Sequence, residues 1–183
     1  MALTGKSKVE TLIECIQAAH GLLEMTTGSI TPEEVHWIPP GIANPMGAHY
    51  AHVVTGEDGA IQGMLKGAAP LFAGTWAGRT GLSELPPMIN PESPGFPDWS
   101  QWGRRVKIDL AAFRKYAQAV YAATFEYLSS LTDEDLTRSL DLSALGFGQS
   151  TVGFLLINGV VGNTFSHTGE ISCLIGLQGK RGY

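Results

Sequence analysis

The C-terminal stretch from residue 151 to residue 176 constrains the fold more than any other part of the chain. It has helical spacing throughout, and its faces are nearly all apolar. Glycines at positions 153, 159 and 162 leave room for a neighbouring helix to approach closely. A helix of this kind must lie at the centre of its domain or at a contact between subunits.

Three earlier segments, residues 7–27, 45–66 and 106–129, also show apolar residues at helical spacing. The first begins with Ser7-Lys8-Val9-Glu10, which has the form of a capping box. A chain of 183 residues can bury one contiguous core. The sequence therefore predicts an all-α protein with one domain over residues 1–183, built as an antiparallel bundle of four main helices.

The connections between these helices differ in character. Residues 67–105 hold most of the prolines and three of the four tryptophans, which predicts a long crossover without helix between the second and third helices. Such a crossover forms a binding loop or lid, or else an ordered wrap over the surface. Residues 139–148 are expected to form an irregular link before the last helix.

Charge and hydropathy exclude several classes of partner. The net charge is −5 and the basic clusters are short and separated, so we expect no nucleic-acid partner. The longest apolar-rich stretch, Phe154–Val161, is too short to span a bilayer, so we expect no membrane partner. Glu10 and Glu14 interrupt any signal-peptide core near the start, and we predict a cytoplasmic protein.

The two cysteines do not form a CxxC motif. Cys15 and Cys173 lie on predicted helices among apolar neighbours, which indicates buried thiols.

Polar side chains interrupt one apolar face of the last helix. Asn163, His167 and Glu170 fall in a narrow stripe of that face. Asn163 and His167 are four residues apart, a spacing at which two side chains of one helix can meet one metal ion. The same spacing also fits a core histidine that is hydrogen-bonded to the Asn or Glu.

The second helix adds His49, His52 and Glu57. Geometry places His49 and Glu57 toward the apolar face and His52 at its edge. Glu57 is either a further metal donor or a buried partner for an Arg or His. His20, near the end of the first helix, is expected to interact with the helix dipole rather than with a metal.

Four stretches in this order resemble the DinB/YfiT-like superfamily. They are Trp37-Ile-Pro-Pro-Gly41, the run Asn44-Pro-Met-Gly-Ala-His-Tyr-Ala-His52, Leu131-Thr-Asp-Glu-Asp-Leu136, and the helix segment Asn163-Thr-Phe-Ser-His167-Thr-Gly-Glu170-Ile171. The likeness covers nearly the whole chain and is weakest across residues 67–105. It implies a DinB-like four-helix bundle, commonly a homodimer, that binds one divalent metal ion, zinc or nickel.

The resemblance also assigns ligands. His52 matches the helix 2 histidine of the family and His167 matches the second histidine of the last helix, while Asn163 stands where the family has the first. A neutral amide is a weak donor for these metals. His49 and Glu57 are the alternative third donors, and Glu170 would support the ligands by hydrogen bonding.

Two functions follow as hypotheses. In the first, the metal ion serves a thiol S-transferase or hydrolase that acts on a small-molecule ligand. The resemblance implies a low-molecular-weight thiol such as bacillithiol or mycothiol as co-substrate. In the second, the protein is catalytically silent, and the bundle is a small-ligand-binding or dimerisation module with a degenerate metal site.

Overall fold

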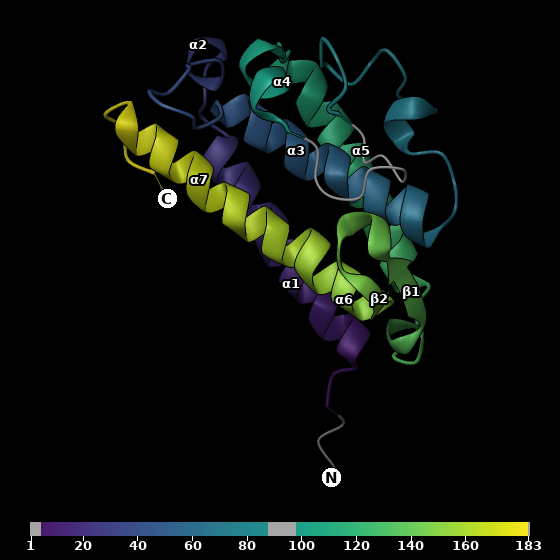
Figure 1. Ribbon diagram of the computed structural model, residues 1–183. Coiled ribbons are helices and arrows are strands. Elements are labelled where there is room, and N and C mark those ends of the chain that lie inside the picture. The colour runs from purple at the N-terminus through teal and green to yellow at the C-terminus, as the bar shows by residue number, and fades with distance from the viewer. Residues whose placement is uncertain (1–4, 88–97, 183) are drawn as a thin grey trace.

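The computed structural model describes residues 5–87 and 98–182. The protein is mostly helical, as predicted, and four long helices form its body (Figure 1). Their bounds are Lys8–Thr27 for α1, Met46–Asp58 for α3, Leu110–Ser129 for α5 and Asn163–Leu177 for α7. Helix α1 contacts α5 and α7, and helix α3 contacts the same two, so each long helix packs against two others.

The first helices begin where the sequence predicts. The Ser7 hydroxyl accepts a hydrogen bond from the Glu10 amide at 3.0 Å, and the Glu10 carboxylate accepts one from the Ser7 amide at 2.8 Å. This confirms the capping box at the start of α1. A second capping box, from Thr31 to Glu34, starts the short helix α2 (Pro32–Val35).

Two of the predicted helices contain π-helical segments. Helix α3 continues as the π-helix η1 (Gly59–Leu65), and the last helix consists of α6 (Val152–Leu155), the π-helix η5 (Leu156–Gly162) and α7. The predicted extents of both helices agree with the structure to within a residue or two. A π-helix is rare and frequently occurs at functional sites, and periodicity alone does not reveal it.

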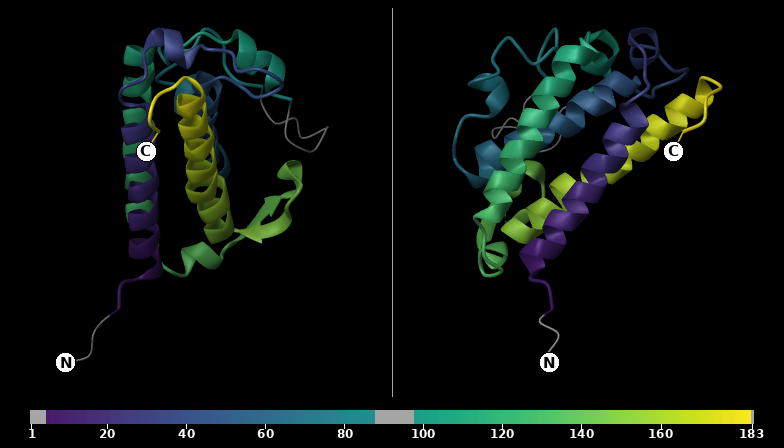
Figure 2. Two further views of the ribbon diagram at one scale, coloured as in Figure 1. Left: turned by 90° about the vertical axis from the view of Figure 1, so that its left-hand side faces the viewer. Right: turned by 180° about the vertical axis from the view of Figure 1, so that it is seen from behind.

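The prediction of an irregular link at residues 139–148 is wrong. Strand β1 (Ser139–Leu142) pairs with β2 (Gly148–Thr151) in an antiparallel hairpin, with Ser139 opposite Thr151. Gly146, with φ of 80°, helps to reverse the chain between the strands. The hairpin is anchored because Leu142 packs against Ala60 and Leu155. It projects from the lower end of the helices (Figure 2).

The crossover contains short helices that were not predicted. These are the 3₁₀ turn η2 (Leu71–Ala73) and the helix α4 (Ser100–Arg105). Gly103 lets α4 lie against α3, because a Cβ at this position would come within 2.9 Å of the Ala48 Cβ. The part of the crossover at residues 88–97 lies outside the described residues. Helix α5 begins at Leu110 rather than Val106, because the Asp109 carboxylate caps it by accepting bonds from two backbone amides. A 3₁₀ turn, η3 (Asp135–Thr137), follows α5.

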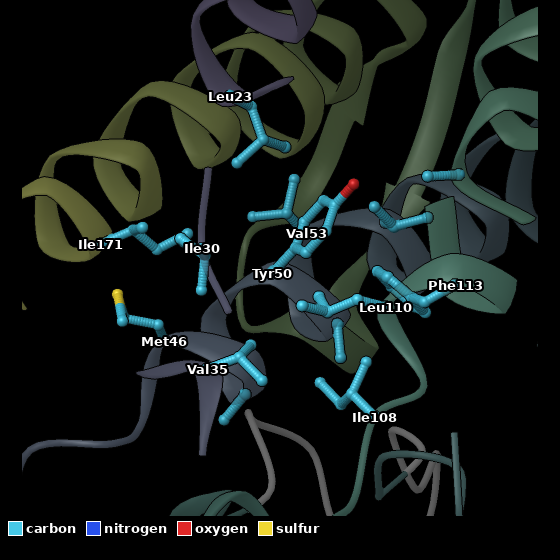
Figure 3. Packing of buried hydrophobic residues seen from close by; sticks show 14 of the residues in the cluster. Leu23, Ile30, Val35, Met46, Tyr50, Val53, Ile108, Leu110, Phe113 and Ile171 are labelled. Atoms are coloured by element: carbon cyan, nitrogen blue, oxygen red, sulfur yellow. The ribbon is translucent and has the colours of Figure 1, made fainter. Parts of the chain in front are cut away.

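The core lies where the four long helices meet. Leu23 from α1, Tyr50 and Val53 from α3, Phe113 from α5 and Ile171 from α7 belong to one buried cluster (Figure 3). Tyr50 and Phe113 pack edge to face, with ring centroids 4.9 Å apart. This cluster fixes α3 against α7, the pair of helices on which the candidate site is built.

The cysteine prediction is wrong, because Cys15 and Cys173 are both exposed. Each cysteine lies on the outer side of its helix, and the apolar residues next to it in sequence lie on other faces of that helix. Several apolar side chains of the C-terminal helix are exposed as well, among them Ile157, Phe165 and Leu177. No helix in the described part of the chain is long and apolar enough to cross a membrane.

Candidate metal centre

Three polar side chains converge between α3 and α7. His49 projects from α3, and His167 and Glu170 project from one side of α7, three residues apart. The His49 Nδ1 lies 3.1 Å from the His167 Nδ1 and 3.0 Å from the Glu170 Oε2. The His167 Nδ1 also contacts the Glu170 Oε2. Among the described residues, this is the one group of three His, Cys, Asp or Glu donors within 4.8 Å of one another.

The group fits a divalent metal ion in both chemistry and spacing. Two imidazoles and one carboxylate form a donor set found at catalytic zinc sites. Three donors at about 2.0–2.1 Å from a tetrahedral ion lie roughly 3.3–3.4 Å from one another. The observed separations of 3.0 and 3.1 Å from His49 Nδ1 are within a few tenths of an ångström of that value. Small side-chain movements would therefore place one ion between these atoms.

The surroundings favour the neutral, metal-binding form of His49. Its side chain is 13% exposed, whereas the Glu170 side chain is 53% exposed, so the group opens toward solvent on the α7 side. Burial lowers the pKa of His49, the charge of Glu170 opposes that shift, and His167 adds to it. A histidine that stays neutral has a free nitrogen lone pair for a metal ion.

His52 lies next to this group without belonging to it. Its ring packs edge to face against His167, with centroids 4.7 Å apart, and against Trp99, with centroids 3.9 Å apart. Burial lowers the pKa of His52 to about 3, His167 adds to this shift, and a hydrogen bond with the Asn163 side chain opposes it. The His52 Nδ1 is buried and has no hydrogen-bond partner. His52 is therefore a neutral imidazole with an unused polar atom.

The rings of His52 and His167, the two histidine ligands that the resemblance implies, are in contact. The convergent donors, however, share only His167 with the set that the resemblance implied. His49 stands three residues before His52 on α3, and Glu170 stands three residues after His167 on α7. Asn163 lies beside His52. Glu170, which was expected only to support the ligands, has its carboxylate among the converging atoms.

Glu57 takes no part in this group. Its carboxylate interacts with the His20 Nε2 at 2.8 Å and accepts a bond from the Thr124 hydroxyl at 2.5 Å. Of the two roles that the sequence left open for Glu57, the structure therefore shows the buried partner of a histidine. The expectation for His20 is wrong: this side chain is buried, pairs with Glu57 and stacks on Tyr121, with ring centroids 3.9 Å apart.

A cavity of about 540 Å³ adjoins the group on the His52 side. Both π-helical segments, the β-hairpin and the crossover contribute to its walls. His52 and Asn163 line it, so the polar residues beside His167 are in contact with the cavity. The sequence analysis did not predict this cavity. The glycines of both π-helical segments, which lack side chains to fill the space, could have indicated it.

Comparison with known proteins agrees with this fold. A family model described as the DinB superfamily matches residues 16–171. The crystal structure of a conserved protein from Enterococcus faecalis is similar to this one, with a TM-score of 0.78 and 19% sequence identity, and the likeness covers 96% of this chain and 100% of that chain. At this identity the likeness shows the fold alone. A comparison with curated proteins found no match.

Proposed function

Because the chain belongs to the DinB superfamily, whose members often bind a metal ion, we propose that it binds one divalent metal ion through His49, His167 and Glu170. The observation that carries the proposal is the convergence of two imidazole nitrogens and one carboxylate oxygen on a single point between α3 and α7. Zinc and nickel both accept such donors.

We further propose that the protein is a metal-dependent thiol S-transferase or hydrolase. A bound ion would lower the pKa of a thiol or water and so supply a nucleophile near neutral pH. The three proposed ligands come from two helices that a buried core holds rigidly together, which keeps the donors in place. His52 and Asn163 face the adjoining cavity, where they would orient the second reactant.

Zinc titration by calorimetry tests the proposal, with metal-stripped protein purified without an affinity tag. We expect one ion per chain in the parent and at least a hundredfold weaker binding in His49→Ala and His167→Ala, because each change removes one of three donors. His36→Ala is the matched control, since His36 does not belong to the group and instead hydrogen-bonds the Pro32 carbonyl and the Ile108 amide. Parent-like zinc binding in His49→Ala would contradict the ligand assignment.

A second candidate is a catalytically silent protein that binds small ligands. Asn163 favours it, because an amide stands where the family carries a histidine ligand. Metal content separates the two functions. Protein isolated without chelator, and containing less than a tenth of an ion per chain after zinc exposure, would favour the silent form.

We also propose that the protein forms a homodimer. The exposed apolar residues Ile157, Phe165 and Leu177 lie along the C-terminal helix, where a second copy would cover them. Light scattering at micromolar concentration should give twice the mass of one chain. A monomeric mass, or a dimer that persists unchanged in Phe165→Glu, would argue against this face.

A further inference from the structure

The described walls of the cavity beside His52 carry no charged side chain. Its lining contains no Asp, Glu, Lys or Arg among the described residues. Apolar side chains come from several elements around it, including Phe72 from the crossover, Leu142 from the hairpin and Phe154 from α6. With a volume of about 540 Å³, it lies within the range of about 300–1,000 Å³ that small-molecule sites occupy.

The polar groups of this cavity lie mainly at one place. The Thr55 hydroxyl donates to the Ala51 carbonyl at 2.7 Å, and the Asn158 amide nitrogen donates to the Phe154 carbonyl at 3.0 Å, so both bond within their own helices. The remaining polar residues of the lining are His52 and Asn163, which lie together beside His167.

We infer that this cavity binds an uncharged, mostly apolar molecule with one polar group, and that this group is directed at His52 and Asn163. A charged ligand would lose its hydration here without gaining a countercharge, which is costly. An apolar body would instead be covered by the walls, and its polar end would lie next to the proposed metal ligand His167. The role of this molecule as a substrate rests on the proposed function, whereas its binding to the cavity does not.

The inference narrows the substrate class of the proposed enzyme. A thiol or acceptor that carries carboxylates finds no cation in the described walls, whereas an aromatic or aliphatic acceptor finds contacts on all sides. A second cavity of about 450 Å³ differs in this respect, because its lining includes Glu34, Lys180 and Arg181. A charged probe therefore has another place to bind, and the test must separate the two cavities.

Two fluorescent probes with the same ring framework test the inference. N-phenyl-1-naphthylamine is uncharged, and 8-anilinonaphthalene-1-sulfonate adds one sulfonate. We expect the uncharged probe to bind at least tenfold more tightly. Gly59→Trp should weaken its binding at least tenfold by filling the cavity, since Gly59 lines it and a Cβ there meets no atom within 4 Å. Gly21→Trp is the matched control, because Gly21 is exposed on α1 and equally open.

Ala144→Trp fills the same cavity from the hairpin, so the test does not depend on Gly59→Trp folding. The inference would be overturned if the charged probe bound as tightly as the uncharged one and lost that binding in Gly59→Trp. Full binding of the uncharged probe in folded Gly59→Trp and Ala144→Trp would overturn it as well. The measurement is repeated with EDTA and in His49→Ala. We expect the uncharged probe to bind in both cases, since the cavity does not need the ion. If the parent protein binds this probe but binds no zinc, the cavity inference stands although the metal proposal fails. Zinc binding without probe binding would refute the cavity inference alone.

Discussion

Replacing Asp58 should destabilise the part of the crossover that forms a wall of the cavity. Asp58 is 1% exposed at the end of α3. Its carboxylate accepts bonds from the Leu71 amide at 2.9 Å, the Phe72 amide at 3.0 Å and the Tyr116 hydroxyl at 2.7 Å. Three donors from two distant segments therefore depend on one side chain.

The magnitude follows from these three bonds. A buried donor left without a partner costs about 1–3 kcal/mol. Asp58→Ala orphans three donors, but it also removes a carboxylate that is costly to bury, so we expect a loss of roughly 3–4 kcal/mol in the free energy of unfolding. Asp58→Asn keeps one acceptor oxygen and should lose about 2 kcal/mol. Tyr116→Phe removes a single bond and should lose about 1 kcal/mol.

Urea unfolding followed by circular dichroism measures these losses through the transition midpoint and slope. Asp141→Ala is the control, because Asp141 is exposed and its hydrogen-bond partners Ser143 and Gln149 lie nearby in sequence. The midpoint of this variant should stay close to that of the parent. A midpoint for Asp58→Ala equal to that of Asp141→Ala would refute the reasoning, since the crossover would then be held by apolar contacts alone.

Three further predictions concern the site, the thiols and pH. Asn163→His should bind zinc at least tenfold more tightly than the parent in calorimetry and depend less on Glu170, because it adds a donor beside His52 and His167; an unchanged affinity would contradict this. Cys15 and Cys173 should both react with Ellman's reagent in the folded protein, because both are exposed, and two protected thiols would contradict the structure. Burial raises the pKa of Asp58, so the part of its contribution that is linked to this shift is complete below the ordinary carboxyl pKa and is lost as the pH rises through the raised value. The difference in urea midpoint between parent and Asp58→Asn should therefore narrow as the pH rises from about 4, and a constant difference would contradict the shift.

The sequence predicted the helices well because their signals are local. The capping box at Ser7 and the apolar spacing in α1, α3, α5 and the last helix each depend on neighbours a few residues apart. The hairpin at residues 139–151 was missed because its strands are four residues long and mostly polar. The burial of Leu142 against Ala60, which is distant in sequence, helps to hold it in place.

For the candidate metal centre, family resemblance and the helical wheel gave different predictions. The wheel placed His49 toward the core and His52 at the edge, whereas the resemblance favoured His52. The structure brings His49 to Glu170 and leaves His52 facing Trp99. Whether His49 or His52 meets Glu170 depends on how α3 and α7 are aligned along their length. No local sequence pattern specifies that alignment. The wheel likewise could not tell that Glu57 pairs with His20 on another helix.

Anomalous diffraction at the zinc absorption edge, from crystals exposed to zinc, would locate a bound ion among these residues. We expect one strong peak per chain between the His49 Nδ1, the His167 Nδ1 and the Glu170 carboxylate, with His52 outside bonding distance. A peak between His52, Asn163 and His167 would show that the metal occupies the position implied by family resemblance. The absence of any peak at these residues, in crystals that show zinc elsewhere, would contradict the metal-binding function itself.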